Sequence, residues 1–178
     1  MELFDLYTLD REKTGLTMVR GDPVPEGYYR LVVHVCIFNE KGQMLIQQRQ
    51  PFKKSWSNLW DVSVGGSAVA GDSSRSAAER ETREELGLSL NLEGVRASMT
   101  IHWENGFDDY YIVHMAPDLS SLRLQYEEVQ QVKWADKEEI LRMIHDGSFI
   151  PYEKSLIELL FFRRNHQSSH TRRDTTDD

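Results

Sequence analysis

Hydrophobic residues along the chain follow two spacings, one typical of strands and one typical of helices. β-Branched and aromatic residues gather in short runs bounded by turn residues, which predicts strands. Asp136 is a preferred capping residue and two glutamates follow it, which predicts a helix over 137–145, while the apolar run 155–162 predicts a closing helix. The strands are expected at 3–9, 16–20, 29–38, 43–49, 60–64, 95–104, 109–116 and 129–134.

Turn residues predict how these strands pair. The turn at 39–42 is expected to return strand 43–49 against 29–38, which is apolar enough to be a central strand. Asn105-Gly106 joins the strands on either side of it into another pair. At the N-terminus, a turn over 10–15 predicts a plain β-hairpin, and two prolines then separate this hairpin from the rest of the chain.

The stretch from Gly65 to Leu88 differs from everything around it. It begins with two glycines, continues through small residues and becomes an acidic helix that should end at Gly87. At about 100° per residue, its glutamates at positions 81, 84 and 85 fall within one narrow sector of the helix. The neighbouring stripe of Ala78, Thr82 and Leu86 can pack inward, whereas Glu79 and Arg83 should face water.

This crowding of carboxylates has two interpretations. Like charges three or four residues apart cost a helix about 0.2–0.5 kcal/mol per pair, so the pattern is either a solvated acidic face or a cation site. Mg²⁺ binds one or two carboxylates, keeps several waters and shares its other positions with phosphate oxygens. Glycine backbone next to three such carboxylates favours a hard divalent ion, but the pattern alone leaves both interpretations open.

A longer motif decides between them. The chain has Gly66, five residues, Asp72, seven residues and then Arg-Glu-Thr-x-Glu-Glu-x-Gly-Leu ending at Leu88. This closely resembles the Nudix box, G-x5-E-x7-R-E-U-x-E-E-x-G-U, where U is aliphatic. Asp72 stands where the family has Glu, and Thr82 stands where it has an aliphatic residue. Neither departure affects the three clustered glutamates.

The resemblance covers residues 28–160 and implies a fold. We expect the α/β class, as a Nudix-type α/β/α sandwich with a mixed β-sheet and an N-terminal β-hairpin. The domain organisation is then a hairpin extension at 1–22, a Nudix domain at 23–162 and a tail at 163–178. The tail is expected to be disordered because it contains almost no apolar residue.

The same resemblance implies an activity and a set of site residues. We expect a Mg²⁺- or Mn²⁺-dependent hydrolase that cleaves a pyrophosphate bond in a nucleoside-diphosphate-linked or related compound. The implied metal ligands are Glu81 and Glu85, with the backbone carbonyl of Gly65. Glu84 is either a second-tier ligand or the base that activates water, and Arg80, one turn away, is expected to orient it.

A further metal ligand is expected from beyond the motif. Glu128 is the preferred candidate together with Glu127, followed by Glu104, Asp108 and Asp109, and each of these is also compatible with a plain surface acid. The segment 49–56 contains Arg49, Lys53 and Lys54 beside Phe52 and Trp56, which indicates either a wall that contacts the substrate or a solvated basic loop. The strand histidines 34, 102 and 114 lack metal-ligand spacing and are interpreted as structural.

Two other functions remain as alternatives. The layout also resembles isopentenyl-diphosphate isomerase, but that enzyme has a catalytic cysteine where this chain has Gly65 and a metal-binding histidine at Ser67. A second ligand histidine of the isomerase would fall near Arg30. The other alternative is a non-catalytic Nudix sensor, which the three intact glutamates and the expected lack of a DNA-binding segment disfavour.

Composition limits the number of domains, the classes of partner and the cellular compartment that we expect. With 178 residues, 39% of them hydrophobic, one well-cored domain is expected. A formal charge of −8 argues against a nucleic-acid polymer as partner, and a single buried cysteine, Cys36, fits a reducing compartment. No apolar run is long enough for a membrane span, so we expect a cytoplasmic protein. The expected partner is a small-molecule diphosphate, with a possible homodimer through the hairpin.

Overall fold

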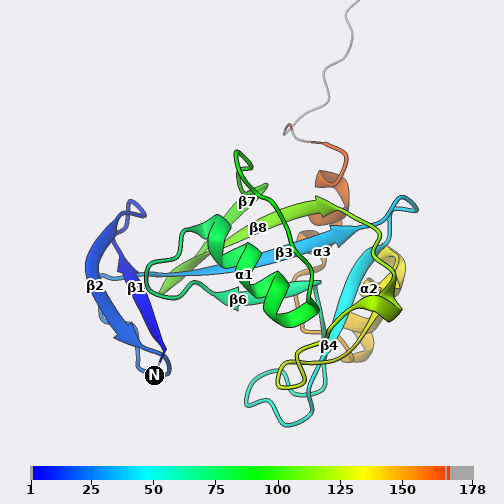
Figure 1. Ribbon diagram of the computed structural model, residues 1–178, viewed down its shortest axis with the longest axis horizontal. Helices are drawn as coiled ribbons and strands as arrows, with labels where there is room; N and C mark the ends of the chain where they lie inside the picture. The colour runs from blue at the N-terminus through cyan, green and yellow to red at the C-terminus, as the bar shows by residue number, and fades with distance from the viewer. Residues whose placement is uncertain (1, 167, 169–178) are drawn as a thin grey trace, which may run out of the picture.

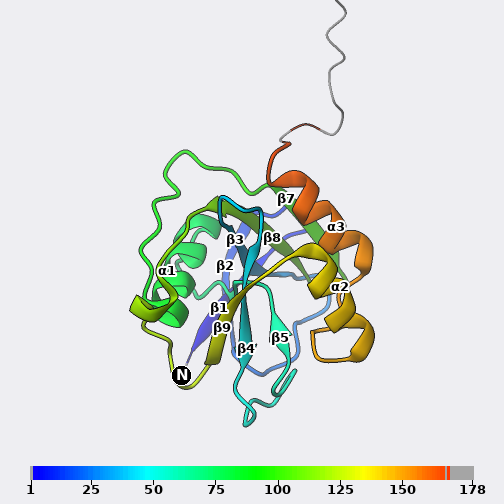
Figure 2. The same ribbon diagram turned by 90° about the vertical axis from the view of Figure 1, so that its right-hand side faces the viewer.

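The computed structural model describes residues 2–166 and 168, and its described part is an α/β sandwich (Figures 1 and 2). A mixed β-sheet lies in the middle, α1 covers one face, and α2 and α3 cover the other. The helices are α1 (Ser74–Leu86), α2 (Lys137–Asp146) and α3 (Lys154–Arg163), with a short 3₁₀ turn at Leu119–Ser121. The strands are β1 (Leu3–Tyr7), β2 (Lys13–Val19), β3 (Arg30–Phe38), β4 (Met44–Arg49), β5 (Trp60–Asp61), β6 (Val64–Ser67), β7 (Met99–Trp103), β8 (Gly106–His114) and β9 (Val129–Ala135). The predicted fold class is confirmed.

Strand β3 is the centre of the sheet, as its apolar sequence predicted. It pairs in parallel with β8 along its whole length and antiparallel with β6 over Val32–Val35. The predicted antiparallel pairing of β3 with β4 is confirmed, but its register is limited to Phe38↔Met44, because β6 occupies the rest of that edge of β3. β4 instead turns away and pairs with β9 and β5.

The predicted strand 60–64 is also divided in two. Ser63 is fully buried between β5 and β6, and its hydroxyl accepts a hydrogen bond from the Ile37 amide at 2.8 Å and donates to the Leu45 carbonyl. This side chain therefore bridges β3 and β4 at the point where they diverge. The divergence opens the sheet on the side where β6 leads into α1.

The core has two parts because side chains of β3 alternate between the two faces of the sheet. Val33 and Val35 pack with Ala78 and Leu86 of α1. Cys36, which is fully buried as predicted, belongs to the cluster that contains the inward faces of α2 and α3. The helix α1 is thus fixed by its small apolar stripe, and its acidic side remains available for chemistry.

The N-terminal hairpin is held against the domain by several contacts. Its turn lies over residues 8–12 and β2 begins at Lys13, so the predicted turn at 10–15 was placed too late. Tyr7 and Tyr29 exchange backbone hydrogen bonds of 2.8 and 3.0 Å. Arg11, with a φ of 64°, reaches from the turn to the buried carboxylate of Asp109 at 2.7 Å.

The C-terminal end differs from its expectation where it is described. Helix α3 ends at Arg163, one residue beyond the predicted end of the closing helix, and His166 stacks on Phe162 with 4.3 Å between ring centroids. The rest of the predicted tail, 167 and 169–178, lies outside the described residues. None of the described helices is long and apolar enough to cross a membrane.

Candidate active site

The acidic helix α1 begins and ends at well-defined caps. Ser73 and Ser76 form a reciprocal capping box, in which each side chain accepts a hydrogen bond from the backbone N–H of the other residue. Gly87 ends the helix with a φ of 69°, a left-handed conformation that glycine adopts without a steric penalty. The buried positions of the helix include Ala78, Thr82 and Leu86, which confirms the predicted inward stripe. Glu79, predicted to face water, instead accepts a hydrogen bond from the Leu92 amide at 2.6 Å.

Strand β6 brings glycine backbone directly against one of the box glutamates. An added Cβ at Gly66 would lie 2.1 Å from the carboxyl carbon of Glu81, so only glycine leaves room for this carboxylate. Burial, opposed by the Arg80 charge, raises the pKa of Glu81. The carboxyl group of Glu81 therefore lies against Gly66, the first residue of the motif.

Glu85 is the most buried carboxylate of the motif, with only 3% of its surface exposed. Its Oε2 atom accepts one hydrogen bond, from the Gln47 side-chain amide on β4 at 2.8 Å. Burial and the nearby Glu81 charge raise the pKa of Glu85 well above its ordinary value. A buried carboxylate that is crowded by a second one gains stability from a bound cation.

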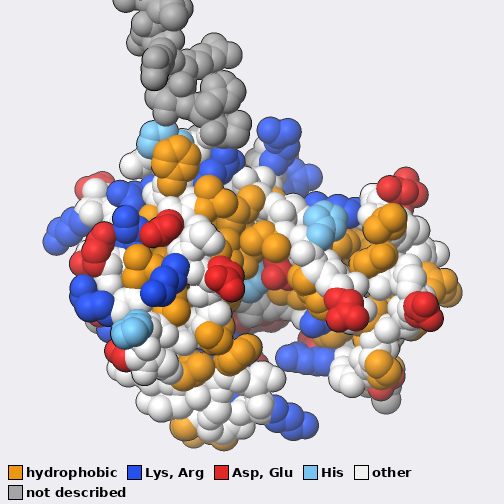
Figure 3. Space-filling view, turned by 180° about the vertical axis from the view of Figure 1, so that it is seen from behind, with side chains coloured by type: hydrophobic (Ala, Val, Ile, Leu, Met, Phe, Trp, Pro, Cys, Tyr) orange, Lys and Arg blue, Asp and Glu red, His pale blue; other side chains and the backbone are white. Residues whose placement is uncertain are grey.

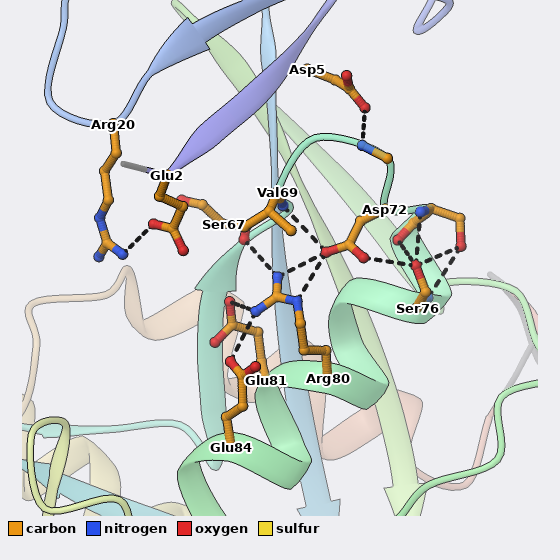
Figure 4. Close-up of polar contacts among 12 residues, drawn as sticks. Glu2, Asp5, Arg20, Ser67, Val69, Asp72, Ser76, Arg80, Glu81 and Glu84 are labelled. Carbon is orange, nitrogen blue, oxygen red and sulfur yellow. Dashed lines mark hydrogen bonds and ion pairs between the residues drawn. The ribbon is translucent and has the colours of Figure 1, made fainter.

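Arg80 organises the third glutamate (Figure 4). Its Nη1 atom donates to Glu81 Oε1 at 2.9 Å and to Glu84 Oε2 at 3.0 Å, while Nε and Nη2 both contact Asp72 Oδ2. Nη2 also donates to the Ser67 carbonyl at 3.2 Å. Burial alone would lower the pKa of Arg80, but the hydrogen bonds and charges of Asp72 and Glu81 raise it. Arg80 is therefore a fixed cation that positions the Glu84 carboxylate, which is 46% exposed at its side chain.

Asp72, the first departure from the family motif, anchors this arginine. We expect Asp72→Ala to lower the free energy of unfolding by about 1–3 kcal/mol, because Arg80 loses its charged partner and Ser76 loses an acceptor. Thermal or urea unfolding measures this loss. Asp72→Glu restores the family residue and should stay near the wild-type stability, and an alanine variant as stable as wild type would contradict the anchoring role.

The structure brings Glu128 to the box from a distant part of the chain. The segment before β9 docks on the end of α1, where the Gln125 amide donates to the Glu85 carbonyl at 3.0 Å. Glu128 is close enough for its charge to raise the pKa of Glu85, and Lys53 Nζ contacts Glu128 Oε1 at 2.6 Å. The predicted distal residue and the predicted basic loop therefore meet beside the box.

The other predicted acids lie elsewhere. Asp109 is occupied by Arg11, Ser74 and Thr100, and Asp108 accepts a hydrogen bond from the Trp103 indole at 2.8 Å. Glu104 and Glu127 are exposed. None of these four residues is among the acids whose charge acts on Glu85, as the charges of Glu81 and Glu128 do.

The basic loop at 50–59 contributes aromatic side chains as well as Lys53. Phe52 is 57% exposed and contacts Tyr126, 71% exposed, at 5.7 Å between ring centroids. Arg49 lies 3.9 Å from Asp61, whereas Lys54 and Trp56 are exposed. Tyr126 and Gln47 were not identified from the sequence, because only the packing of distant segments shows that they reach this region.

The group fits a divalent cation in part. As the side chains stand, no three acidic, histidine or cysteine residues of the described chain are grouped closely enough to hold a metal ion. Arg80 draws the carboxylates of Glu81 and Glu84 toward itself. The carboxylates of Glu81, beside Gly66, and of Glu85, with a single amide donor, are nevertheless oxygen groups of the kind that hard cations prefer.

The histidines occupy separate places, and one of them concerns the isomerase alternative. His34 is buried and stacks on Tyr110, with 4.5 Å between ring centroids. A Cβ at Gly65 would lie 3.2 Å from His34 Nδ1, so a larger residue there would have to displace the imidazole. The isomerase has metal-binding histidines at the position of Ser67 and near that of Arg30. In this chain the side chains of Arg30 and Ser67 instead form a hydrogen bond of 3.0 Å with each other.

Comparison with known proteins identifies the family of the chain. The NUDIX domain family matches residues 28–157. An uncharacterized Nudix hydrolase of Listeria monocytogenes is 47% identical over 170 residues, covering 96% of this chain and 99% of that protein. An Escherichia coli isopentenyl-diphosphate Delta-isomerase is 33% identical over 113 residues, 61% of this chain and 62% of the isomerase. The crystal structure of a Deinococcus radiodurans protein superposes with a TM-score of 0.70 at 26% identity, covering 89% of this chain and 97% of that one. The chain belongs to the Nudix hydrolase family, whose members cleave pyrophosphate bonds in small molecules.

Proposed function

We propose that this Nudix hydrolase requires Mg²⁺ or Mn²⁺ and cleaves a nucleoside-diphosphate-linked compound or a related small molecule. One observation carries the proposal: Glu85 is buried beside Glu81, and Glu81 lies against Gly66. Two buried acids at a glycine backbone are costly without a cation. A divalent ion bound there would neutralise the charge on the diphosphate and lower the pKa of bound water.

The residues of the chain would then share the work. Glu81, Glu85 and Glu128, with the Gly65 carbonyl, hold the metal. Glu84 is exposed and fixed by Arg80, so it is placed to accept the proton of the attacking water or to serve as an outer ligand. Arg80 acts as a positioning residue, because its contacts are with carboxylates and backbone of the protein.

A nucleotide part of the substrate is supported by the loop beside the box. Phe52 and Tyr126 present exposed rings next to Lys53, and bases stack on exposed aromatic side chains. The Lys53 ammonium, paired with Glu128, lies where a phosphate oxygen could exchange for the carboxylate. A homodimer through the N-terminal hairpin is part of the same proposal, and light scattering tests it.

The deciding experiment is a substrate panel. Nucleoside triphosphates, sugar nucleotides, dinucleoside polyphosphates and prenyl diphosphates are incubated with Mg²⁺ or Mn²⁺, and the products are separated by chromatography. We expect cleavage of a pyrophosphate bond that stops with chelator and with Glu85→Gln. Allylic rearrangement of isopentenyl diphosphate would establish the isomerase instead, and tight metal-free binding without turnover would establish a sensor.

A further inference from the structure

A hollow lies on the face of the sheet opposite α1. It is a cavity of about 760 Å³ between the first part of β3, strands β7 and β8, and the start of α3. Figure 3 shows this face of the molecule, with hydrophobic side chains gathered around the hollow. Its walls include the rings of Trp103, Tyr110 and Tyr152 and the side chains of Leu156 and Leu159. The cavity is therefore built mainly from apolar and aromatic groups.

One cation faces this cavity without an acidic partner. Arg30 stacks on Trp103, with its guanidinium carbon 5.1 Å from the ring centroid, and donates to Ser67 Oγ at 3.0 Å. Within the described chain, no carboxylate lies within 4.0 Å of the Arg30 guanidinium. Burial lowers the pKa of Arg30, and the nearby charge of Asp108 opposes this without cancelling it. A guanidinium has five N–H donors, so most of its capacity is unused here.

Of the acids that line the cavity, Asp108 opposes the effect of burial on Arg30, but the pKa of Arg30 stays lowered. Asp108 Oδ1 accepts from the Trp103 indole at 2.8 Å, and Oδ2 lies 3.5 Å from His34 Nε2. Glu153 is exposed at the start of α3. In the described chain, Arg30 thus has no carboxylate within ion-pair distance, which leaves its outer N–H groups open to an anion from outside the protein.

The cavity is joined to the catalytic backbone through Ser67. Its hydroxyl accepts from Arg30, while its carbonyl accepts from Arg80 at 3.2 Å. Ser67 directly follows Gly66, the residue against which Glu81 lies. An anion on Arg30 would thus lie one residue along β6 from the proposed metal site.

We propose that Arg30 binds a phosphate group of the substrate and that the apolar or aromatic part of the same molecule occupies this cavity. The ligand class is an organic phosphate with a ring-bearing or apolar body. This assignment rests on the proposed function for the identity of the ligand as substrate, but the binding itself requires neither metal nor turnover. Arg30 thereby determines specificity for the charged end of the molecule.

The test uses the full chain in chelator with two probes of the same shape, 1-naphthyl phosphate and 1-naphthol, titrated calorimetrically. Wild type should bind the phosphate about tenfold to a hundredfold more tightly than the alcohol, as expected for charge-assisted hydrogen bonds. Arg30→Gln should remove that preference and leave naphthol binding unchanged. Arg142→Gln, an exposed arginine of α2, is the matched control and should behave as wild type.

Several results would overturn the proposal. These are no saturable binding by wild type, equal affinity for both probes, or a preference that survives Arg30→Gln. Arg30→Gln also loses the hydrogen bond to Ser67 and the stacking on Trp103, so wild-type affinity for naphthol is the measurement that shows an intact cavity, and a loss of affinity for both probes would indicate a structural role. Arg30→Lys keeps the positive charge but lacks the planar guanidinium, so it should show an intermediate preference for naphthyl phosphate over naphthol. A preference equal to that of wild type would contradict the proposed role of the Arg30 guanidinium. Failure of the substrate panel would leave this binding result standing, so the two proposals fail separately.

Discussion

Glu85→Gln is expected to reduce pyrophosphate cleavage by about 10²-fold or more while the protein stays folded. The amide has the shape of the carboxylate but cannot neutralise a divalent ion, and metal sites supply much of the charge stabilisation in such hydrolyses. The carboxylate oxygen that accepts from Gln47 at 2.8 Å is replaced by an amide that still provides an acceptor. Steady-state rates with Mg²⁺ measure the loss. Glu158→Gln, an exposed glutamate of α3, should keep wild-type rates.

Without metal, Glu85→Gln should be more stable than wild type at neutral pH, although it is the less active protein. Burial and the Glu81 charge raise the pKa of Glu85 above its ordinary value of 4.5, so the folded protein holds that proton more tightly than the unfolded chain. Wild-type stability in chelator therefore decreases as pH rises from the unfolded value toward the raised folded one. Glutamine has no proton to lose, so Glu85→Gln should lack this decrease and be the more stable protein at neutral pH. Urea unfolding across pH measures it, and parallel curves for both proteins would contradict the burial argument.

The sequence predicted the box helix well because its information is local. Periodicity places Ala78 and Leu86 inward, and a glycine ends the helix, so α1 and its acidic face follow from neighbouring residues. The resemblance of the motif then indicates the reaction. These signals all lie within one short segment, so they are independent of how distant segments pack.

Sequence reasoning failed where distant segments decide the outcome. Strand β4 pairs with β3 as the short turn between them predicted, but the pairing stops after Phe38↔Met44 because β6 takes the rest of that edge and Ser63 bridges the divergence. A single buried serine hydroxyl has no periodic signal, so the split of strand 60–64 could not be read from the pattern. The hairpin turn was misplaced for a similar reason, since Arg11 is held there by a contact with Asp109.

In the candidate site, too, the residues close together in sequence were predicted, whereas those brought in from distant segments were not singled out. Glu128 was one of several acids proposed from sequence, and only the docking of its loop on the end of α1 separates it from Glu104, Asp108 and Asp109. Gln47 was not recognised, although a glutamine that follows the apolar run of β4 is a weak signal of a buried polar contact. Burial of the carboxylates, which determines their electrostatics, comes from tertiary packing and has no local signature.

Gly66→Ala tests the space that glycine leaves beside the Glu81 carboxylate, and we expect it to cause the second large loss of activity. The backbone of Gly66 is not in the left-handed region, so alanine is conformationally allowed there. Its methyl group would nevertheless lie 2.1 Å from the Glu81 carboxyl carbon, and the flexible side chain must move away. We expect activity to fall nearly as far as in Glu81→Gln, about 10²-fold, with a stability change below about 1 kcal/mol.

Double substitution separates this mechanism from a general disturbance. If alanine acts only by displacing the Glu81 carboxylate, the double variant Gly66→Ala/Glu81→Gln should be no slower than Glu81→Gln alone. Gly65→Ala is the comparison variant: its methyl meets the imidazole of His34, 3.2 Å from Nδ1, instead of a carboxylate, and it keeps the backbone carbonyl proposed as a metal ligand. It should therefore lose much less activity than Gly66→Ala. Additive losses in the double variant, or equal losses at the two glycines, would mean that the space beside Glu81 is not what the reaction requires.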